Sequence, residues 1–251
     1  MITFNPFTLE GKTILVTGAS SGIGRGIAIA CSKMGATVII NGRNEQRLAE
    51  TMTEMQGEEN LSLAADLSDS NSLIGMVSRL PKLDGIVHCA GIGQRVLCKQ
   101  LQEADLDTMM DVNFKAPVML QTEILKQKKI NKGASIVFIA SIASDSPSIG
   151  NAVYSASKGA IISYANCLAL ELAPRQIRVN CILPAMIWTD LILKGGITEE
   201  ELKEDEKKYP LKRYGKPEDI ANLSIYLLSN AAAWMTGSSI KITGGGRPKL
   251  N

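Results

Sequence analysis

The sequence predicts one α/β domain with a doubly wound parallel sheet of about seven strands and helices on both faces. Two observations carry this prediction. Short β-branched runs alternate with longer segments of helical spacing along the whole chain of 251 residues, and a glycine-rich turn follows the first run. Alternating strands and helices favour right-handed crossovers, which cover both faces of a parallel sheet. Because no repeat or linker interrupts the pattern, residues 1–251 are expected to form a single domain.

Strand-length runs bounded by turn residues make up the predicted sheet. They are residues 13–16, 37–40, 61–64, 85–88, 135–139, 177–182 and 239–242. Helical spacing is clearest in two places. These are Ile23, Ile27, Ala30 and Met34 after the first strand, and residues 155–172, which contain no Gly or Pro after Gly159.

The segment 188–217 lacks an early strand or helix pattern. It carries Gly195 and Gly196, followed by a charged run at 199–208. An insertion of this kind in an α/β enzyme is often a lid over the active site, and a substrate lid is the expectation here. A solvated surface helix is the alternative, and the charge favours it for the second half.

The charge balance argues against several classes of function. The chain has 27 Lys+Arg and 25 Asp+Glu, a net charge of +2, which does not favour a nucleic-acid partner. The lysine-rich run 126–132 is therefore expected to be a solvated helix end. With one histidine, His88, and no cysteine cluster, neither a metal site nor a Ser-His-Asp triad is expected.

Scattered cysteines without a Cys-x-x-Cys pair indicate reduced, mostly buried thiols and hence a cytoplasmic protein. The N-terminal residues lack the basic and apolar regions of a signal peptide, and the longest apolar runs are strand-length. Neither secretion nor a membrane span is therefore expected. The cysteines are Cys31, Cys89, Cys98, Cys167 and Cys181.

A phosphate-binding turn is predicted at residues 17–24, which read Thr-Gly-Ala-Ser-Ser-Gly-Ile-Gly. Glycine permits positive φ and a close approach of the backbone to a pyrophosphate, and the following helix N-terminus offers N–H groups to an anion. Because the turn joins a strand to an amphipathic helix, it predicts a Rossmann-like dinucleotide site rather than an ordinary turn. Its expected coenzyme contacts are Gly18, Ser20, Ser21, Gly22, Ile23 and Gly24.

The end of the second strand predicts NADP(H) rather than NAD(H). An NAD-binding unit usually presents an acidic residue there, whereas this chain has Asn41, Gly42 and Arg43. Arg43 can pair with a 2′-phosphate through two charge-assisted hydrogen bonds. Arg25, just inside the first helix, is either a second support for that phosphate or a solvated helix residue.

Tyr154-Ser155-Ala156-Ser157-Lys158, together with the glycine-rich turn, resembles the signature of the classical short-chain dehydrogenase/reductase family over nearly the whole chain. The four-residue spacing puts Tyr154 and Lys158 on one face of a helix. A lysine cation about 4 Å from a phenol stabilises the phenolate by roughly 4 kcal/mol at an effective dielectric of about 20, before desolvation is counted. The pair is therefore expected to perform general acid-base catalysis and to hold the coenzyme.

The resemblance implies two further members of the catalytic set. Ser141 follows the strand 135–139 and would bind the substrate carbonyl oxygen, although Ser144 and Ser146 compete for this role on composition. Asn113 matches the family's structural asparagine, which supports a water-mediated proton relay to the lysine. It is also interpreted as an asparagine that kinks or caps a helix, and both roles can hold.

The resemblance also extends the coenzyme site. Asp66 would hold the adenine amino group, and His88 and Cys89 replace the usual asparagines after the fourth strand, so His88 is expected to be structural. Ala185 stands where the family has glycine, in a segment expected to face the nicotinamide carboxamide. The coenzyme contacts added in this way are Asp66, Leu67, Ala90, Gly91, Pro184, Ile187 and Thr189.

These residues predict an NADPH-dependent oxidoreductase that reduces a ketone to a secondary alcohol, with proton transfer from Tyr154. The alternatives are a 3-oxoacyl thioester reductase, because residues 213–219 resemble 3-oxoacyl-acyl-carrier-protein reductases, and a cofactor-binding regulator without catalysis. The resemblance implies a homotetramer or homodimer. Largely apolar side chains favour an acyl, alicyclic or aromatic ketone: Val96, Ile142, Met186, Trp188 and Leu191, with Gln94 and Arg95 as an anchor for an anion.

Overall fold

The computed structural model describes residues 5–193 and 198–246, in which seven parallel strands form one sheet in the order β3-β2-β1-β4-β5-β6-β7. Each predicted strand is confirmed. β5 begins at Ile130 rather than at residue 135, because Ile130 pairs with Leu83 before a shift in register that polar residues conceal in the sequence. The strands are β1 (Thr13–Thr17), β2 (Thr37–Gly42), β3 (Leu61–Ala64), β4 (Leu83–His88), β5 (Ile130–Ile139), β6 (Arg178–Pro184) and β7 (Ser238–Ile242).

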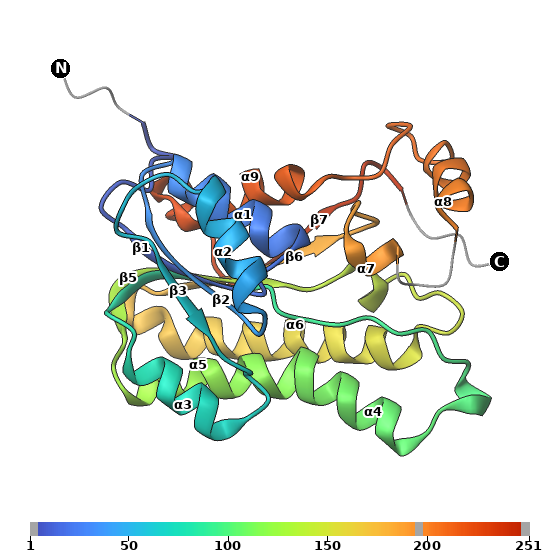
Figure 1. Cartoon of the computed structure of the whole chain (residues 1–251), viewed down its shortest axis with the longest axis horizontal. Coiled ribbons are helices and arrows are strands. Elements are labelled where there is room, and N and C mark those ends of the chain that lie inside the picture. Colours follow the sequence, from blue (N-terminus) through green and yellow to red (C-terminus); the bar gives the residue numbers. More distant parts are fainter. Residues whose placement is uncertain (1–4, 194–197, 247–251) are drawn as a thin grey trace.

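Helices cover both faces of the sheet, which confirms the doubly wound fold (Figure 1). Of the described helices, none is long and apolar enough to cross a membrane. Above the sheet in this view lie α1 (Gly22–Lys33), α2 (Glu45–Glu54) and α9 (Pro217–Leu228). Below it lie α3 (Ser70–Ser78), α4 (Glu103–Met110), α5 (Ala116–Lys126) and α6 (Ala152–Leu172), and to the right lie the short α7 (Asp190–Leu193) and α8 (Glu199–Glu206).

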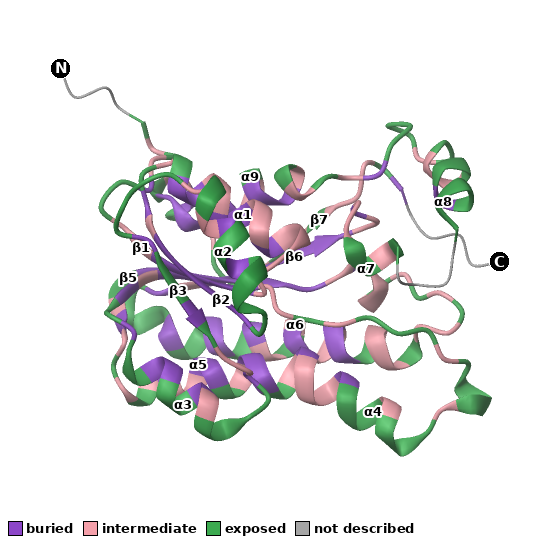
Figure 2. Ribbon diagram, in the orientation of Figure 1, coloured by how far each residue is buried: buried purple, intermediate pink, exposed green. Residues whose placement is uncertain are grey.

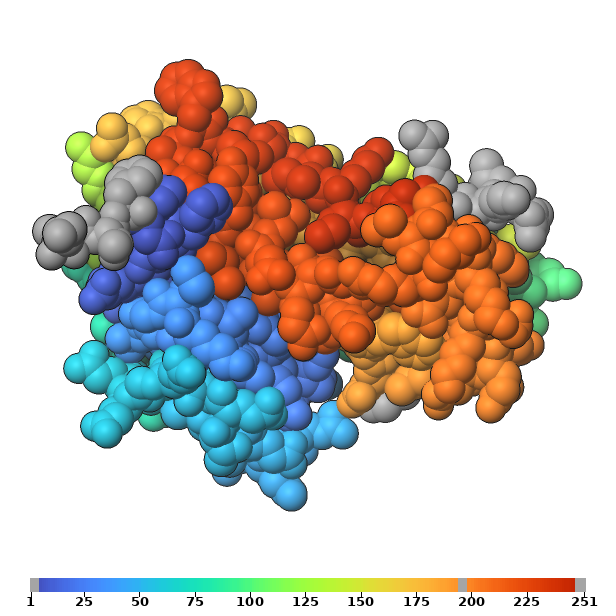
Figure 3. All heavy atoms as spheres, turned by 90° about the horizontal axis from the view of Figure 1, so that it is seen from above, coloured from blue at the N-terminus to red at the C-terminus, as the bar shows by residue number. Residues whose placement is uncertain are grey.

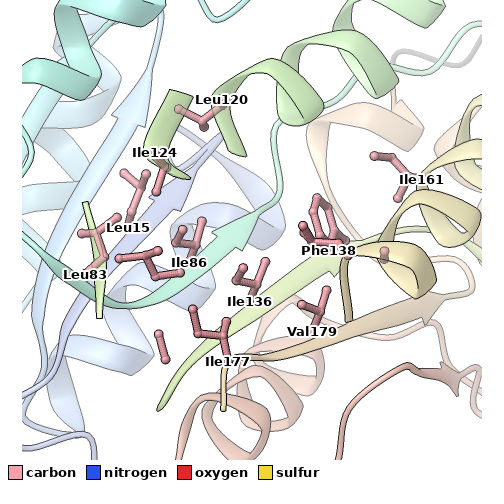
Figure 4. Close-up of a cluster of buried hydrophobic side chains, with 14 of the residues drawn as sticks. Leu15, Leu83, Ile86, Leu120, Ile124, Ile136, Phe138, Ile161, Ile177 and Val179 are labelled. Carbon is pink, nitrogen blue, oxygen red and sulfur yellow. The ribbon is translucent and has the colours of Figure 1, made fainter. Parts of the chain in front are cut away.

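Two hydrophobic cores form because alternate side chains of each strand point to opposite faces of the sheet. Leu15 and Ile86 belong to the core between the sheet and helices α3, α5 and α6, where Figure 4 shows Ile124 of α5 close to both. Ile14 and Val16 belong to the second core, under α1 and α9. Figure 2 shows the result, with buried central strands between helices whose outer faces are exposed.

Thr17 joins the carboxyl ends of β1 and β4. Its Oγ1 accepts hydrogen bonds from the backbone N–H groups of Cys89 at 3.1 Å and Ala90 at 3.2 Å. The chain leaves β1 towards β2 on one side, while β4 lies on the other, so a crevice opens at this point of the sheet. Ligands of open α/β sheets bind in such a crevice, and the candidate site residues gather there.

The segment 188–217 is described except for residues 194–197, so the predicted glycine pair lies outside the described residues. α8 is largely exposed, which agrees with the solvated helix that its charge favours. Tyr214 fixes α8 to the rest of the molecule. Its hydroxyl donates to Asp205 at 2.7 Å, and its backbone N–H donates to Glu206 at 2.9 Å.

The cysteine prediction is wrong in one respect. Cys31 and Cys181 are buried and Cys89 is half-buried, but Cys98 and Cys167 are exposed. Cys98 starts a short 3-10 turn, and Cys167 lies on the outward face of α6. The two thiols escape burial because neither position packs against the sheet.

Candidate active site

The backbone of the phosphate-binding turn requires its glycines. Gly18 has a φ of +68°, and a Cβ at this position would lie 2.8 Å from the backbone of Ala90. Gly22 has a φ of +53°, and a Cβ on Gly24 would overlap the carbonyl oxygen of Gly18. Since any side chain would strain the turn or fill the space that it encloses, this backbone forms a cradle for a ligand.

The N-terminus of α1 is open to an anion. No side chain caps it at Ser21, whereas Asn44 caps α2 and Asp69 caps α3. The first N–H groups of a helix need an acceptor and carry the positive end of the helix dipole. A phosphate group beside Ser20, Ser21 and Ile23 would supply that acceptor, so the turn fits a dinucleotide.

Arg25 braces this turn, which corrects both interpretations made from the sequence. Its Nη2 donates to the carbonyl oxygen of Ser20 at 2.9 Å and to the carboxylate of Glu50 at 3.0 Å. Its Nε donates to Thr51 Oγ1 at 3.0 Å, and Thr51 in turn donates to the carbonyl oxygen of Ala19 at 2.9 Å. The guanidinium therefore ties the turn to α2 and is neither solvated nor free to hold a phosphate.

The end of β2 offers an exposed cation, Arg43, in a long ion pair with Asp66. The Arg43 side chain is 69% exposed, and its Nη1 lies 4.0 Å from the Asp66 carboxylate. Asn41 is buried, and its amide donates to the carbonyl oxygens of Leu63 at 3.0 Å and Ala65 at 3.3 Å. Asn41 thus holds β2 against β3, and Arg43 is the polar group of this strand end that remains available to a ligand.

The other predicted coenzyme residues border the same crevice. Asp66 and Leu67 follow β3, where Asp66 accepts a hydrogen bond from the backbone of Ser68 at 2.9 Å and the Leu67 side chain is buried. Ala90 and Gly91 follow β4. The carboxyl ends of parallel strands lie at one edge of the sheet, so these two pairs flank the phosphate-binding turn.

The segment after β6 reaches the phosphate-binding turn. Pro184 ends β6, and Ile187 is buried and forms an isolated bridge with Gly215. A Cβ on Gly22 would lie 3.1 Å from Thr189 Cγ2, so Thr189 packs directly against the turn. The structure therefore brings together residues of the turn and of this segment that are far apart in the sequence.

Tyr154 and Lys158 lie one turn apart on α6. Lys158 Nζ is 5.8 Å from the centroid of the Tyr154 ring. Lys158 is buried, and its Nζ donates to the carbonyl oxygen of Ile139 at 3.0 Å. A Cβ on Gly91 would lie 3.4 Å from the same Nζ. The cation is therefore held between the ends of β4 and β5, close to the phenol.

Asn113 lies on a π-helical turn, Asp111–Lys115, that joins α4 to α5. Its side chain accepts from the backbone N–H of Ile92 at 2.8 Å and donates to the carbonyl oxygen of Ile92 at 3.0 Å. A Cβ on Gly91 would lie 3.1 Å from Asn113 Oδ1, so Asn113 and Lys158 approach the same glycine. The π turn is the helix distortion anticipated from the sequence, and π turns often mark functional sites.

Ser141 caps the 3-10 turn η3 (Ile142–Ser144) that follows β5, and its Oγ accepts from the backbone N–H of Ala143 at 3.1 Å. Ser144 Oγ donates to the Ser141 carbonyl oxygen at 2.9 Å and to Asp145 at 3.2 Å. η3 packs against α6, the helix that carries Tyr154. Because Ser144 is engaged in holding this turn together, Ser141 is the better candidate for a substrate contact.

Sequence reasoning missed the ion pair that braces the same turn. Asp145 pairs with Lys241 of β7 at 2.6 Å, and the hydrogen bond from Lys241 lowers the pKa of the Asp145 carboxyl below its usual range. The partners lie far apart in the sequence, on a loop and on an edge strand. Neither shows a local pattern that could have revealed the contact.

His88 is structural, as expected. It is buried, its ring stacks on Phe138 with centroids 4.4 Å apart, and its Nε2 forms a hydrogen bond with Gln121 Oε1 at 3.1 Å. Burial lowers the pKa of His88 to about 4, so the ring is neutral near pH 7. Within the described ranges, no group of three His, Cys, Asp or Glu residues is placed to hold a metal ion.

Two residues of the predicted substrate pocket lie together at the start of α6. Gln94 and Val96 line a hollow together with Val153, the residue that precedes Tyr154. Leu191 reaches the loop after β4, since a Cβ on Gly93 would lie 3.5 Å from Leu191 Cδ1. Gln94 donates to the carboxylate of Asp105 at 3.0 Å, so its amide is not a free anchor for an anion.

Ile142 and Trp188 do not line the pocket as predicted. Ile142 is buried in the core beneath α6. The Trp188 indole N–H donates to Glu206 at 3.2 Å, and its ring packs against Tyr214 with centroids 5.4 Å apart. Both positions were assigned from motif spacing, which does not reveal the direction of a side chain.

Comparison with known proteins agrees with this arrangement. The model of a family described as Enoyl-(Acyl carrier protein) reductase matches residues 18–246. The 3-oxoacyl-acyl-carrier-protein reductase FabG of Rickettsia felis is 36% identical over 237 residues, which cover 94% of this chain and 97% of that protein. The similarity therefore spans every candidate site residue.

Solved structures share the whole fold. A 7α-hydroxysteroid dehydrogenase complexed with NADH and 7-oxo glycochenodeoxycholic acid is 31% identical, with a TM-score of 0.90 over 99% of this chain and 100% of that chain. A protein described as an NAD(P) dependent gluconate 5-dehydrogenase from Beutenbergia cavernae, with bound NADP, is 30% identical, with a TM-score of 0.86 over 96% of this chain and 98% of that one. Since similar chains hold either coenzyme, the choice between them depends on local residues.

Proposed function

The chain belongs to the short-chain dehydrogenase/reductase family of oxidoreductases, and from this premise we propose that it is an NADPH-dependent reductase that converts a ketone to a secondary alcohol. The observation that carries the proposal is the position of Lys158 Nζ, buried and 5.8 Å from the centroid of the Tyr154 ring. A fixed cation beside a phenol stabilises the negative charge that develops while the phenol gives its proton to a substrate.

Two features of the chain support NADP(H) as the coenzyme. The uncapped N-terminus of α1 accepts the pyrophosphate, and Arg43 at the end of β2 pairs with the 2′-phosphate. The residues proposed to hold the coenzyme are Gly18, Ser20, Ser21, Gly22, Ile23, Gly24, Arg43, Asp66, Leu67, Ala90, Gly91, Tyr154, Lys158, Pro184, Ile187 and Thr189. When bound, the coenzyme supplies the hydride.

The chain's own residues position the substrate and move the proton. Ser141 donates a hydrogen bond to the substrate carbonyl oxygen, and Tyr154 delivers a proton to the same oxygen. Lys158 stabilises the phenolate that remains and holds the nicotinamide ribose. Asn113, which lies close to Lys158, positions the water that returns a proton to this pair.

An apolar ketone is the proposed substrate class, with a 3-oxoacyl thioester as the specific candidate. Val96 lines a hollow with Val153, the residue before Tyr154 in the sequence, and Leu191 reaches the loop after β4. The identity of 36% to a protein named 3-oxoacyl-acyl-carrier-protein reductase favours the thioester. We propose residues 188–217 as a lid over this substrate, because Thr189 already packs on the phosphate-binding turn.

A homotetramer or homodimer is the proposed assembly. The family resemblance implies it, and α4, α5 and α6 each expose one large apolar side chain that such a contact would cover. They are Leu106 on α4, Met119 on α5 and Leu170 on α6.

The Tyr154→Phe variant tests the reaction. NADPH oxidation is followed spectroscopically with an acetoacetyl thioester and with a panel of cyclic and aromatic ketones, and each assay is repeated with NADH. Removing the hydroxyl removes the proton donor, so we expect turnover to fall by at least about 1,000-fold while the Kd for NADPH changes less than about 3-fold.

Tyr164→Phe is the matched control, because Tyr164 lies on the same helix but packs edge-on against Phe138 in the core. If the Tyr154→Phe variant kept its turnover, the assignment of Tyr154 as the proton donor would be wrong. Turnover of the thioester that requires Tyr154 supports an acyl reductase, and turnover of the other ketones alone supports a different metabolite. Tight NADPH binding without turnover of any ketone would support the alternative of a regulator that binds the coenzyme without catalysis.

A further inference from the structure

An ion pair joins the lid to the coenzyme-binding side of the sheet. Arg47 Nη1 on α2 lies 3.3 Å from Asp190 Oδ2 at the start of α7. The two side chains are 46% and 52% exposed, so water and salt screen the pair, and the attraction between them is weak. A stronger anion close to Arg47 would therefore displace Asp190 easily.

Arg47 lies on α2, close in the sequence to the strand end where the adenosine ribose of a dinucleotide is proposed to bind. It lies in the first turn of α2, four residues after Arg43, the proposed ligand of the 2′-phosphate. Arg25 Nη2 donates both to the carbonyl oxygen of Ser20 at 2.9 Å and to that of Arg47 at 3.3 Å. One nitrogen thus holds the backbone of Arg47 next to the phosphate-binding turn, and the long arginine side chain can reach a phosphate there.

Asp190 reaches Arg47 from the segment after β6. Thr189, its neighbour, packs against Gly22 at the start of α1, so residues 189–190 cross the N-terminus of that helix to reach Arg47. Figure 3 views this face of the molecule, where the blue N-terminal part of the chain meets the orange part that contains the lid. The ion pair therefore joins α2 to the start of α7 beside the N-terminus of α1.

We propose that Arg47 is a second ligand of the coenzyme 2′-phosphate and that Asp190 competes with the phosphate for it. This inference rests on the proposed use of NADP(H). A phosphate monoester carries about −1.5 to −2 charges at pH 7 and accepts two parallel hydrogen bonds from a guanidinium, whereas Asp190 carries a single charge. Arg47 therefore turns from Asp190 to the phosphate, and the start of α7 is released. NADH presents a hydroxyl at this position and leaves the ion pair intact.

The test measures the Kd of NADPH and of NADH for the whole protein from coenzyme fluorescence, without turnover. Arg47→Gln is expected to weaken NADPH binding about 10-fold, because it removes a charge-assisted contact, and to change NADH binding less than about 2-fold. Asp190→Asn removes the competitor and is expected to strengthen NADPH binding about 3-fold. In the Arg47→Gln background, Asp190→Asn is expected to change nothing.

Lys203→Gln is the matched control, since it removes an exposed cation of α8 that pairs with Glu199 and lowers the net charge by the same amount. An equal loss of NADPH and NADH affinity in Arg47→Gln, or no loss at all, would overturn the proposal. So would an effect of Asp190→Asn that persists without Arg47.

Failure of the proposed coenzyme is distinguished by a further variant, Arg43→Gln. If the wild-type protein prefers NADPH and Arg43→Gln removes the preference while Arg47→Gln does not, only the role of Arg47 is wrong. If the wild-type protein prefers NADH, the proposed coenzyme itself is wrong, and the inference about Arg47 falls with it.

Discussion

At the scale of single residues, the contacts of a buried polar side chain, rather than its burial, separate a candidate catalytic group from one that supports the fold. Lys158 and His88 are both buried, and both lie at carboxyl ends of the central strands or next to them. Lys158 keeps a position beside a phenol and one backbone acceptor. His88 stacks on Phe138 and forms a hydrogen bond with Gln121, and both contacts lie within the core.

His88 predicts an acid-sensitive fold. An unfolded chain protonates the ring below a pKa of about 6.5, whereas the folded protein keeps it neutral down to about 4. The unfolded state therefore binds an extra proton between these values, and stability falls as the pH drops through this window. We expect a loss of roughly 3 kcal/mol by pH 4 from this one group.

The measurement is urea unfolding at pH 7 and pH 4.5 for the wild type and for His88→Asn. Because the chain has one histidine, no other imidazole contributes to the difference. The variant is expected to lose roughly 2 to 3 kcal/mol less than the wild type between the two pH values. An identical loss in both proteins would show that His88 is not the group responsible.

At the scale of elements, the π turn between α4 and α5 carries the most information. It turns Asn113 inward, where one amide satisfies both the N–H and the carbonyl of Ile92 and also donates to Ser157 Oγ at 3.1 Å. These bonds connect the loop after β4 to α6. A regular helix would place the residue at a different angle, so the distortion itself positions the loop that borders Lys158.

Asn113→Ala is expected to lower the free energy of unfolding by about 2–4 kcal/mol, since it leaves part-buried backbone groups of Ile92 without partners. Chemical denaturation without coenzyme measures this loss. Lys115→Ala on the same π turn is the control, because it removes only an exposed pair with Asp111 and should cost less than about 0.5 kcal/mol. Equal effects of the two substitutions would contradict the bracing role of Asn113.

At the scale of the whole molecule, the coenzyme crevice is built by segments from both ends of the chain. Gly26 on α1 allows α9 to pack closely, since a Cβ there would lie 2.7 Å from Pro217. The turn after β1 touches the end of β4 and the segment after β6. A ligand in the crevice therefore contacts much of the fold, and its binding should stabilise the domain as a unit.

NADPH at 100 times its Kd is expected to add about 2.7 kcal/mol to stability, which raises the Tm by roughly 5 to 10 °C for a chain of this size. Differential scanning fluorimetry measures the shift. At the same NADPH concentration, Arg43→Gln should give a shift smaller by a few degrees, while NADH should shift both proteins equally. A folded wild-type protein with no shift would contradict the coenzyme site.

Local patterns in the sequence determined the strands, the phosphate-binding turn and the pairing of Tyr154 with Lys158. Each depends on residues within one turn, one strand or one helix: alternating β-branched runs make strands, glycines permit the turn, and a spacing of four aligns two side chains. A few neighbouring residues are enough to show each of these patterns. For this reason the sheet could be predicted from the sequence, whereas Ser141, Asn113 and the later coenzyme residues were expected only from the resemblance to a family.

Only the tertiary structure decided what each side chain contacts across the sheet. Arg25 holds the phosphate-binding turn through a hydrogen bond to Ser20 and is not free to bind a phosphate. Trp188 packs on Tyr214, and Asp145 forms an ion pair with Lys241 on the edge strand. The Arg47–Asp190 pair is of the same kind. These contacts join residues distant in the chain, and their geometry depends on how helices and loops pack, which periodicity and spacing do not specify.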